Sequence, residues 1–408
     1  MNRLLLCCSA CLLTMVVPGL DGPLAQERVG LSGALGQLLE EGIPDLLVRK
    51  EKGDEEKLLD PIIMIRGSWV TTMEDTIEHQ AGDKTVLIDS SKMDTSQFGH
   101  REGFVLDNVE LGVEGRHRKS GVYYRAKFEL VPREKDGNPA SGDYLRDAYA
   151  GWNGLSVLDW RIGRMKIPFS QANMKSTEHR WMVNSPVLDT LVPKRQVGTQ
   201  LGLSDPWGIV ALKGGVFNST SLASEQLRDT EKLMWVGRGE FQGKRLLETL
   251  GLKLSWIDFK VGGSFASVKE NYDVRTKHQW WGVDTHLRVG PVQVEAEYTV
   301  RDFYSVPLLD GSSTANHGVG WHVDLLVDLW PGVVDLAVRL EQMDGEEELV
   351  RGFSTTLSTD ELVPQKKRWV TAGARLHISP EASLLLNYVY REELEGFSFD
   401  NDMFIAMF

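Results

Sequence analysis

The sequence predicts an all-β protein, a transmembrane antiparallel up-and-down β-barrel of about 16 strands, and three observations support this fold class. From Pro61 to the last residue, segments of about ten residues alternate apolar and polar side chains between turn-rich stretches. Short and long connections follow one another along the chain. Beyond the first 25 residues no stretch of about 18 apolar residues occurs, so no membrane-spanning helix is predicted.

Residues 1–25 predict a cleaved signal peptide. Arg3 precedes an apolar run from Leu4 to Leu20, and small residues follow at Gly22 and Ala25. A membrane anchor is the alternative, but the run is at the short end of a span and contains a proline. The chain's 3 cysteines all lie in this segment. We therefore expect a mature protein without disulfides, thiolate metal sites or a cysteine nucleophile.

Residues 26–60 differ in pattern from everything that follows. Leucines at 31, 35 and 38 recur at helical spacing, and Lys50 to Lys57 is a dense mixed-charge stretch. The pattern predicts a short helix and a linker on the periplasmic side, with disorder as the alternative. Residues 61–408 are predicted to form the barrel.

Sixteen segments fit strands, and an even number is expected of a single-chain bacterial barrel. They are centred near Ile62, Val105, Val122, Tyr144, Trp160, Val197, Ile209, Met234, Leu252, Trp281, Val294, Val323, Val334, Val370, Leu384 and Phe404. Short connections include Lys119 to Gly121 and Gly290-Pro291, whereas Ser170 to Arg195 and Asp344 to Lys366 are long. Such an order is typical of periplasmic turns and external loops.

The segment from Gly121 to Val131 shows the alternation clearly. One face carries Val122, Tyr124, Ala126, Phe128 and Leu130, and the other carries Tyr123, Arg125, Lys127 and Glu129. In a membrane barrel the first face contacts lipid and the second lines a water-filled lumen. In a soluble sandwich the apolar face would be the core instead, so alternation alone leaves both arrangements open.

Aromatic residues near the segment ends and at the C-terminus favour the membrane barrel. They are Tyr123, Tyr124, Tyr149, Trp152, Trp160, Trp280, Trp281, Trp321 and Trp330. Rings at these positions fit an interfacial girdle, although aromatic β-formers also pack in soluble cores. The chain ends in an alternating segment whose last residue is Phe408, which resembles the signal that outer-membrane assembly machinery reads in barrel proteins.

Several motifs between Phe104 and Asn218 resemble the phosphate-selective porin O and P family. An Asp-Ala-Tyr-Ala-Gly-Trp stretch starts at Asp147, and Arg-Ile-Gly-Arg-Met-Lys-Ile-Pro-Phe-Ser starts at Arg161. Further similar stretches are Asn-Val-Glu-Leu-Gly-Val-Glu-Gly from residue 108, Arg-Gln-Val-Gly-Thr-Gln-Leu-Gly from residue 195 and Gly-Val-Phe-Asn from residue 215. The resemblance covers a quarter to a third of the chain, and its strength lies in the order of the motifs.

The resemblance implies homotrimers of sixteen-stranded barrels, with the third loop folded inward and basic residues guiding anions such as phosphate. It identifies that loop as the segment from Gln171 to Pro193. The loop and its hinge carry Lys175, Arg180, Lys194 and Arg195 against Glu178 and Asp189. Charges at a constriction set ion selectivity, whereas a solvated external loop would leave them without a specific role.

Both signs of charge occupy the positions predicted to face the lumen. The basic residues are Arg125, Lys127, Arg161, Arg301, Arg339 and Arg375, and the acidic ones are Glu110, Glu114, Glu129, Asp284, Glu295, Glu297, Asp324 and Asp328. Phosphate binding needs several convergent cations, and no ladder of arginines stands out. We therefore expect passive diffusion of ions and small hydrophilic solutes, without cofactor or metal.

Two other classes of protein remain as alternatives, a barrel hydrolase and a plugged barrel that is structural or binds a ligand. No Gly-x-Ser-x-Gly, His-Glu-x-x-His or P-loop pattern occurs, so we do not expect an enzyme. Sixteen strands normally enclose an aqueous channel, which disfavours a plug. The formal net charge of −13 disfavours nucleic acid. We expect the bacterial outer membrane, with its lipid and lipopolysaccharide, as the environment.

Overall fold

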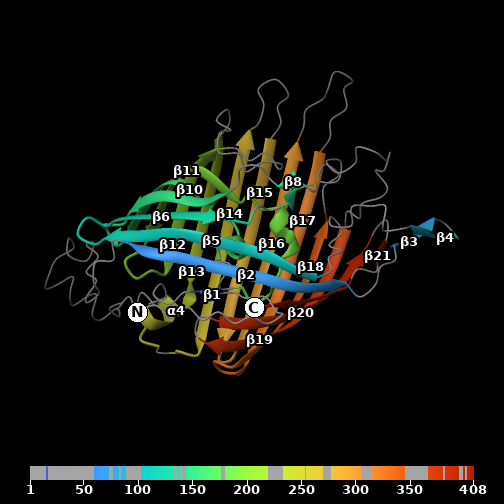
Figure 1. Cartoon of the computed structure of the whole chain (residues 1–408). Coiled ribbons are helices and arrows are strands. Elements are labelled where there is room, and N and C mark those ends of the chain that lie inside the picture. The colour runs from blue at the N-terminus through green and yellow to red at the C-terminus, as the bar shows by residue number, and fades with distance from the viewer. Residues whose placement is uncertain are drawn as a thin grey trace, which may run out of the picture.

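The computed structural model describes most of the predicted barrel (Figure 1). The described residues are 15–16, 59–72, 77–81, 84–88, 103–131, 134–135, 138–139, 144–175, 180–218, 233–252, 254–269, 277–304, 315–344, 366–379, 382–394, 398–399 and 402–408. The predicted signal peptide and linker therefore lie almost entirely outside the described residues.

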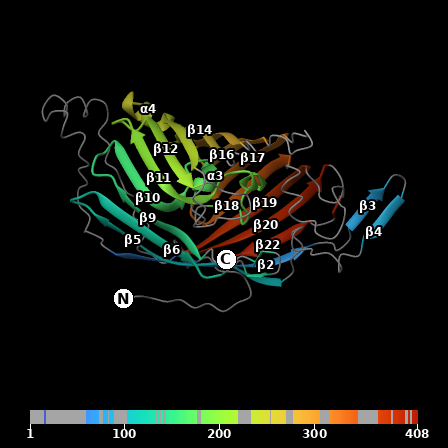
Figure 2. The ribbon, with the colours of Figure 1, turned by 90° about the horizontal axis from the view of Figure 1, so that it is seen from above.

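Sixteen antiparallel strands form one closed sheet. They are β2 (Asp60–Thr72), β5 (Gly103–His117), β6 (Val122–Glu129), β9 (Leu145–Trp152), β10 (Leu158–Lys166), β11 (Arg195–Ser204), β12 (Val210–Asn218), β13 (Leu233–Gln242), β14 (Ile257–Lys269), β15 (Lys277–Val289), β16 (Val292–Tyr304), β17 (Ala315–Trp330), β18 (Val334–Asp344), β19 (Lys366–Ser379), β20 (Ala382–Glu393) and β22 (Met403–Met407). Each strand pairs with the next, and Figure 2 shows the resulting ring. The predicted fold class and strand number are confirmed.

The C-terminal strand closes the barrel. β22 pairs on one side with β20, where Leu386 lies opposite Ala406, and on the other with β2, where Trp69 lies opposite Ala406. Closure leaves no open sheet edge in the ring, as a barrel in lipid requires. A further two-residue strand, β1 (Met15–Val16), pairs with β2 and β20.

Connections alternate in length between the two ends of the barrel. Six of those at one end are short, residues 118–121, 153–157, 205–209, 290–291, 331–333 and 380–381. The seventh, residues 243–256, contains the helix α4 (Gly243–Thr249). The strand expected near Leu252 therefore begins only at Ile257, because α4 and its C-terminal turn occupy the preceding residues.

The other end of the barrel carries the long loops. Loops after β2 and β20 contribute β3 (Ile77–Ala81), β4 (Lys84–Ile88) and β21 (Ser398–Phe399) to a separate small sheet. The loop after β6 contains the short pair β7 (Glu134–Lys135) and β8 (Asn138–Pro139). The loop after β10 contains α3 (Gln171–Met174) and the 3-10 helix η4 (Val187–Thr190).

The barrel is apolar outside and polar inside. On β6, Phe128 is 45% exposed, whereas its neighbours Lys127 and Glu129 are 6% and 4% exposed. Large exposed apolar side chains recur on the outer face of most strands, and buried charged side chains recur on the inner face. A soluble sandwich has its apolar side chains inside and its polar side chains outside. The distribution seen here is the reverse, and it is the one expected of a barrel with lipid outside and water inside.

Exposed aromatic rings form two girdles. Near the turns they are Tyr124, Trp160, Trp207, Trp256 and Trp330, and near the loops they are Phe104, Tyr144, Trp235, Trp281 and Tyr390. Not every predicted girdle residue lies outside. Trp280 is buried on the inner face beside the exposed Trp281, because adjacent residues of a strand point to opposite sides.

Candidate pore and constriction loop

The third long loop, residues 167–194, folds into the barrel. Its apolar residues Ile167, Phe169, Leu188 and Val192 are at most 5% exposed. They pack against inward side chains of β12 to β15, namely Phe217, Met234, Val236, Ala266, Val268 and Trp280. Figure 2 shows α3 within the ring of strands. The described part of this loop is therefore not a solvated external loop, and it lies where the family resemblance implied.

Polar contacts anchor the loop to the wall opposite its origin. The backbone N–H of Val183 donates to Oδ1 of Asn387 on β20 at 2.8 Å, and that of Val187 donates to Oε2 of Glu341 on β18 at 2.6 Å. The N–H of Ala172 donates to Glu297 on β16 at 3.2 Å. The loop thus crosses the lumen from β10 toward β16 to β20 and narrows the passage.

The start of the loop is a defined hinge. Ser170 has φ 64°, a conformation that costs on the order of 1–3 kcal/mol for a residue other than glycine. Its Oγ accepts a hydrogen bond from the N–H of Asn173 at 3.1 Å and so caps α3. The Asn173 side chain donates to the carbonyl of Pro193 at 3.1 Å, which ties the two ends of the loop together.

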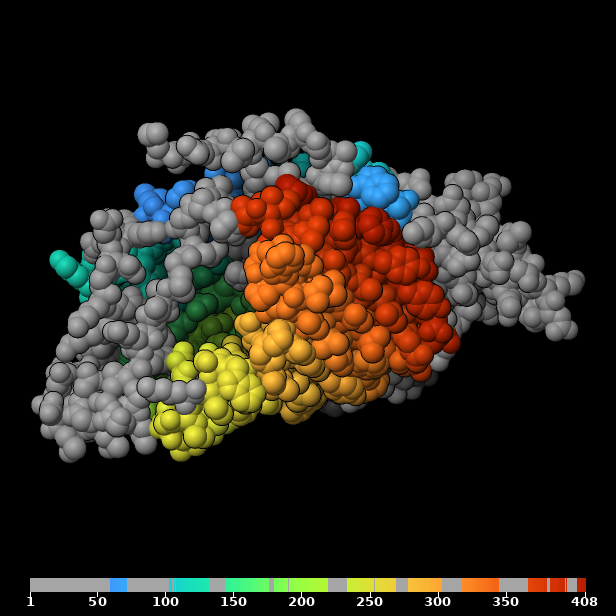
Figure 3. All heavy atoms as spheres, turned by 90° about the horizontal axis from the view of Figure 1, so that it is seen from below, coloured from blue at the N-terminus to red at the C-terminus, as the bar shows by residue number. Residues whose placement is uncertain are grey.

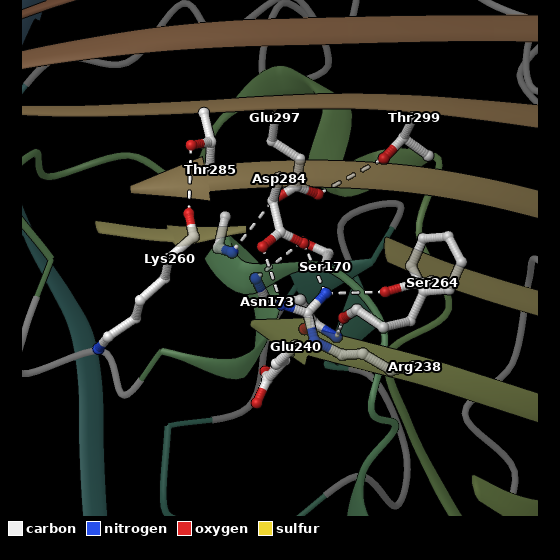
Figure 4. A network of polar contacts seen from close by, with 12 residues as sticks. Ser170, Asn173, Arg238, Glu240, Lys260, Ser264, Asp284, Thr285, Glu297 and Thr299 are labelled. Atoms are coloured by element: carbon white, nitrogen blue, oxygen red, sulfur yellow. Dashed lines mark hydrogen bonds and ion pairs between the residues drawn. The ribbon is translucent and has the colours of Figure 1, made fainter. Parts of the chain in front are cut away.

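Buried ion pairs stiffen the inner wall under the loop. Arg339 of β18 holds Asp324 of β17 through two hydrogen bonds of 2.7 and 2.8 Å, and its Nη1 donates to the carbonyl of Asn184 at 2.9 Å. Arg238 holds Asp284 in the same bidentate way at 2.5 and 2.8 Å, as Figure 4 shows. Planar two-point contacts of this kind fix geometry as well as charge.

Among the basic residues predicted at the constriction, Lys175 and Arg195 form ion pairs with carboxylates of the wall. Lys175 pairs with Glu295 of β16, and Arg195 pairs with Asp147 of β9 at 2.8 Å. Arg180 donates to the Ser185 hydroxyl within the loop at 2.5 Å. Lys194 lies at the loop's end, half-buried. Glu178, an acidic residue of the same loop, lies outside the described residues.

Of the six basic residues predicted to face the lumen, Arg125, Lys127, Arg161 and Arg339 lie on the inner wall and pair with carboxylates. The pairs are Arg125–Glu114 at 2.7 Å, Lys127–Glu110, Arg161–Asp159 at 2.8 Å and Arg339–Asp324 at 2.7 Å. The pairs differ in access to water. The side chains of Arg125 and Arg161 are 37% and 36% exposed, whereas those of Lys127 and Arg339 are 7% and 6% exposed.

Four basic residues form a row that sequence reasoning found only in part. Arg125, Arg161, Lys213 and Lys260 are each the fourth residue of an alternate strand, β6, β10, β12 and β14. Strands two apart are separated by about 10 Å, so the row follows one side of the lumen above the turns. The alternation of charges does not single out Lys213 and Lys260, although their distance from the preceding turn is a usable signal.

Within this row the basic partner is the more accessible one. The exposed fractions are 37% for Arg125 against 32% for Glu114, 36% for Arg161 against 29% for Asp159, and 31% for Lys213 against 20% for Glu240. Lys260 is exposed, and its ammonium extends away from the Arg238–Asp284 cluster in Figure 4. At the equivalent fourth position, β16 carries Glu295, so the basic row stops there.

Arg161 also belongs to an aromatic cluster in the lumen. Its guanidinium carbon lies 5.7 Å from the ring centres of both Tyr123 and Tyr149, and its Nε donates to the Tyr123 hydroxyl at 2.8 Å. The two rings meet edge to face at 6.3 Å. Stacking of this kind holds a guanidinium in place without neutralising it.

A closed barrel of sixteen strands, polar within and narrowed by an inward loop, is the architecture of a passive-diffusion porin. The model of the family described as phosphate-selective porin O and P matches residues 88–312, more than half of the chain. The chain therefore belongs to this family. None of the helices in the described residues is long and apolar enough to cross a membrane.

Solved outer-membrane proteins share the fold at low sequence identity. The channel DcaP of Acinetobacter baumannii is 14% identical with a TM-score of 0.53, and the match covers 89% of this chain and 99% of that one. OmpF of Salmonella typhi is 13% identical, TM-score 0.50, covering 86% and 97%. OmpT of Vibrio cholerae is 10% identical, TM-score 0.50, covering 86% and 98%. No curated protein sequence matches the chain.

Proposed function

We propose that this porin conducts small anions in preference to cations, along the row of Arg125, Arg161, Lys213 and Lys260. The observation that carries the proposal is that the basic side chain is the more accessible member in each ion pair of the row. In a narrow passage with low-dielectric walls, accessible charges of one sign raise the local concentration of the opposite ion. The carboxylates beside them limit the preference, so it is weaker than that of a phosphate-specific site.

The basic residues predicted at the constriction have a different role in this proposal, which is to position the loop. Lys175, Arg180, Lys194 and Arg195 lie on the loop or its hinge, where a passing ion comes nearest to the protein. Pairing of Lys175 with Glu295 and of Arg195 with Asp147 makes them positioning residues for the loop. Selectivity then depends on the row in the wall more than on the loop.

Ion preference is measured as the reversal potential of single channels in a planar bilayer under a salt gradient. We expect the reversal potential of the unmodified protein to have the sign of an anion-selective channel. In Arg161→Gln, Lys213→Gln and Lys260→Gln we expect it to shift toward the value of a cation-selective channel. Lys244→Gln is the matched control, since it removes the same charge from α4, outside the strands. A cation-selective unmodified channel would overturn the proposal, and silence from folded, inserted protein would favour a plugged or enzymatic barrel.

We further propose an outer-membrane homotrimer, delivered through a cleaved signal peptide and inserted by the barrel-assembly machinery beside lipopolysaccharide. Family membership supports the location, and OmpT of Vibrio cholerae is described in a trimer form. No catalytic activity is proposed. The homotrimer and the signal cleavage are tested by mass measurement of the protein extracted in mild detergent. The mass of the complex gives the number of subunits, and the mass of the single chain gives the position of the processed N-terminus.

A further inference from the structure

One connection at the turn end of the barrel is unlike the rest. Residues 243–256 link β13 to β14, whereas the other connections at that end have two to five residues. α4 ends in a well-defined cap. The N–H of Leu252 donates to the carbonyl of Leu247 at 2.9 Å, that of Gly251 donates to Glu248 at 3.0 Å, and Gly251 has φ 80°. This is a Schellman stop, so the end of α4 has a fixed conformation as far as Leu252.

α4 starts from the outer surface of the barrel. A Cβ placed on Gly243 would run into the ring of Phe259, so the first residue of α4 lies directly on that ring. Phe259 stands on the outward face of β14, between the inward Lys260 and Asp258 positions, and it contacts Phe241 with ring centres 6.0 Å apart. In Figure 3 the yellow residues around α4 project at the rim, beside a hollow in which green residues lie deep.

The segment presents apolar side chains that protein does not cover. Leu250 is 62% exposed, Leu252 is 48% exposed and Trp256 is 54% exposed. They continue the exposed apolar belt of the barrel, since Val261 on β14 is 49% exposed and Trp207 in the nearby turn after β11 is 38% exposed. Exposed apolar side chains grouped at one place in this way mark an interaction site.

We propose that α4, Leu250, Leu252 and residues 254–256 form a membrane-surface anchor, which rests in the periplasmic leaflet and binds phospholipid. Three features favour lipid over a protein partner. The exposed leucines lead through Trp256 into the lipid-facing side of β14, this tryptophan is at the level of the turn-side girdle, and Lys244 at the start of α4, beside the Arg245–Glu248 ion pair of 2.9 Å, suits phosphate headgroups. Leu250 and Leu252 then insert about 5–10 Å into the boundary between the headgroups and the acyl chains.

Spin labels on single cysteines test the anchor in the full chain. Leu250→Cys is made in a background where Cys7, Cys8 and Cys11 are serine, and the protein is reconstituted in phosphatidylethanolamine and phosphatidylglycerol vesicles. Collisions with oxygen report lipid, and collisions with a nickel chelate report water. Val283→Cys, at an outward site that is 58% exposed, is the lipid control. Lys119→Cys, in an exposed turn at the same end, is the water control.

We expect the oxygen-to-nickel ratio at position 250 to shift from the Lys119 value toward the Val283 value. A ratio equal to that at Lys119 would overturn the anchor. Low collision rates with both reagents, together with spin–spin broadening, would also overturn it and would assign the surface to a second copy of the chain. Unchanged conductance in the labelled variants shows that the barrel is folded, and this readout is independent of the ion preference proposed above.

Discussion

The indole Nε1 of Trp280, on β15, donates a hydrogen bond to the carbonyl oxygen of Leu191 in the constriction loop, over a distance of 2.9 Å. The two residues are 89 positions apart, so the bond fastens the loop to a wall that it does not adjoin in sequence. The Arg301 guanidinium lies over the face of the Trp280 ring, 5.5 Å from the ring centre, and helps to hold the ring in place.

Trp280→Phe is predicted to loosen the loop while leaving the barrel intact. An aromatic ring stays, but the N–H donor and the five-membered part of the indole are lost, so the cost is about 1 kcal/mol for one buried hydrogen bond plus that of a small cavity. We expect larger current fluctuations in single open channels and faster amide exchange in residues 187–192. Trp281→Phe is the control, because Trp281 is 54% exposed on the outer face. Equal noise in the two variants would show that the bond does not hold the loop.

Asp324→Asn is predicted to be strongly destabilising. It leaves the Arg339 guanidinium without its carboxylate at a site where both side chains are 6% exposed. Loss of one partner of a buried pair costs roughly 3–5 kcal/mol. The measurement is urea unfolding in detergent micelles.

Asp328→Asn on the same strand is the comparison for Asp324→Asn. It breaks a pair with Arg288, whose side chain is 51% exposed. An exposed pair contributes about 1 kcal/mol or less. Similar losses in the two variants would contradict the account of the inner wall as a stiff scaffold.

The strands followed from the sequence because period two is a local signal that each strand carries by itself. Where the signal was misleading, a local competitor explains it. Leu250, Leu252 and Leu254 alternate like a strand, yet the Schellman stop after α4 fixes Leu250 and Leu252 in a turn, and the N–H of Leu254 donates to the carbonyl of Leu252. The sequence alone also could not pair the charges, because partners such as Arg339 and Asp324 meet only when the register of β17 and β18 is known.

The loop position came from resemblance, and its anchors could not be predicted. The sequence places Trp280 in the girdle together with Trp281, because aromatic residues near a strand end fit an interface. Its inward direction depends on strand parity, and its partner Leu191 depends on the path of an irregular loop. Neither is encoded in a short sequence window. Lys213 and Lys260 differ in this respect, because counting four residues from each turn would have found them.

Gly320→Val is predicted to lower single-channel conductance. Gly320 faces the lumen on β17, and a Cβ there would lie 2.8 Å from Cβ of Leu188 and 3.1 Å from Cδ1 of Leu191. The added side chain must push the loop away from the wall and into the open passage. Gly263→Val is the control, since a Cβ at Gly263 meets nothing within 4 Å. Unaltered conductance in Gly320→Val would mean that the loop yields without narrowing the pore.

Phe408→Ser is predicted to reduce assembly in cells more than it reduces stability. Phe408 directly follows β22, whose five residues close the barrel between β20 and β2, and it packs only at the edge of the adjoining apolar cluster. A residue that machinery reads acts before the barrel closes, whereas a packing residue acts after. Phe404→Ser separates the two roles, because Phe404 lies within β22 and meets Trp69 with ring centres 6.2 Å apart. We expect Phe408→Ser to refold normally in detergent yet to reach the outer membrane poorly, and Phe404→Ser to be weakened in both measurements. Equal losses of the two variants in detergent would assign Phe408 to packing.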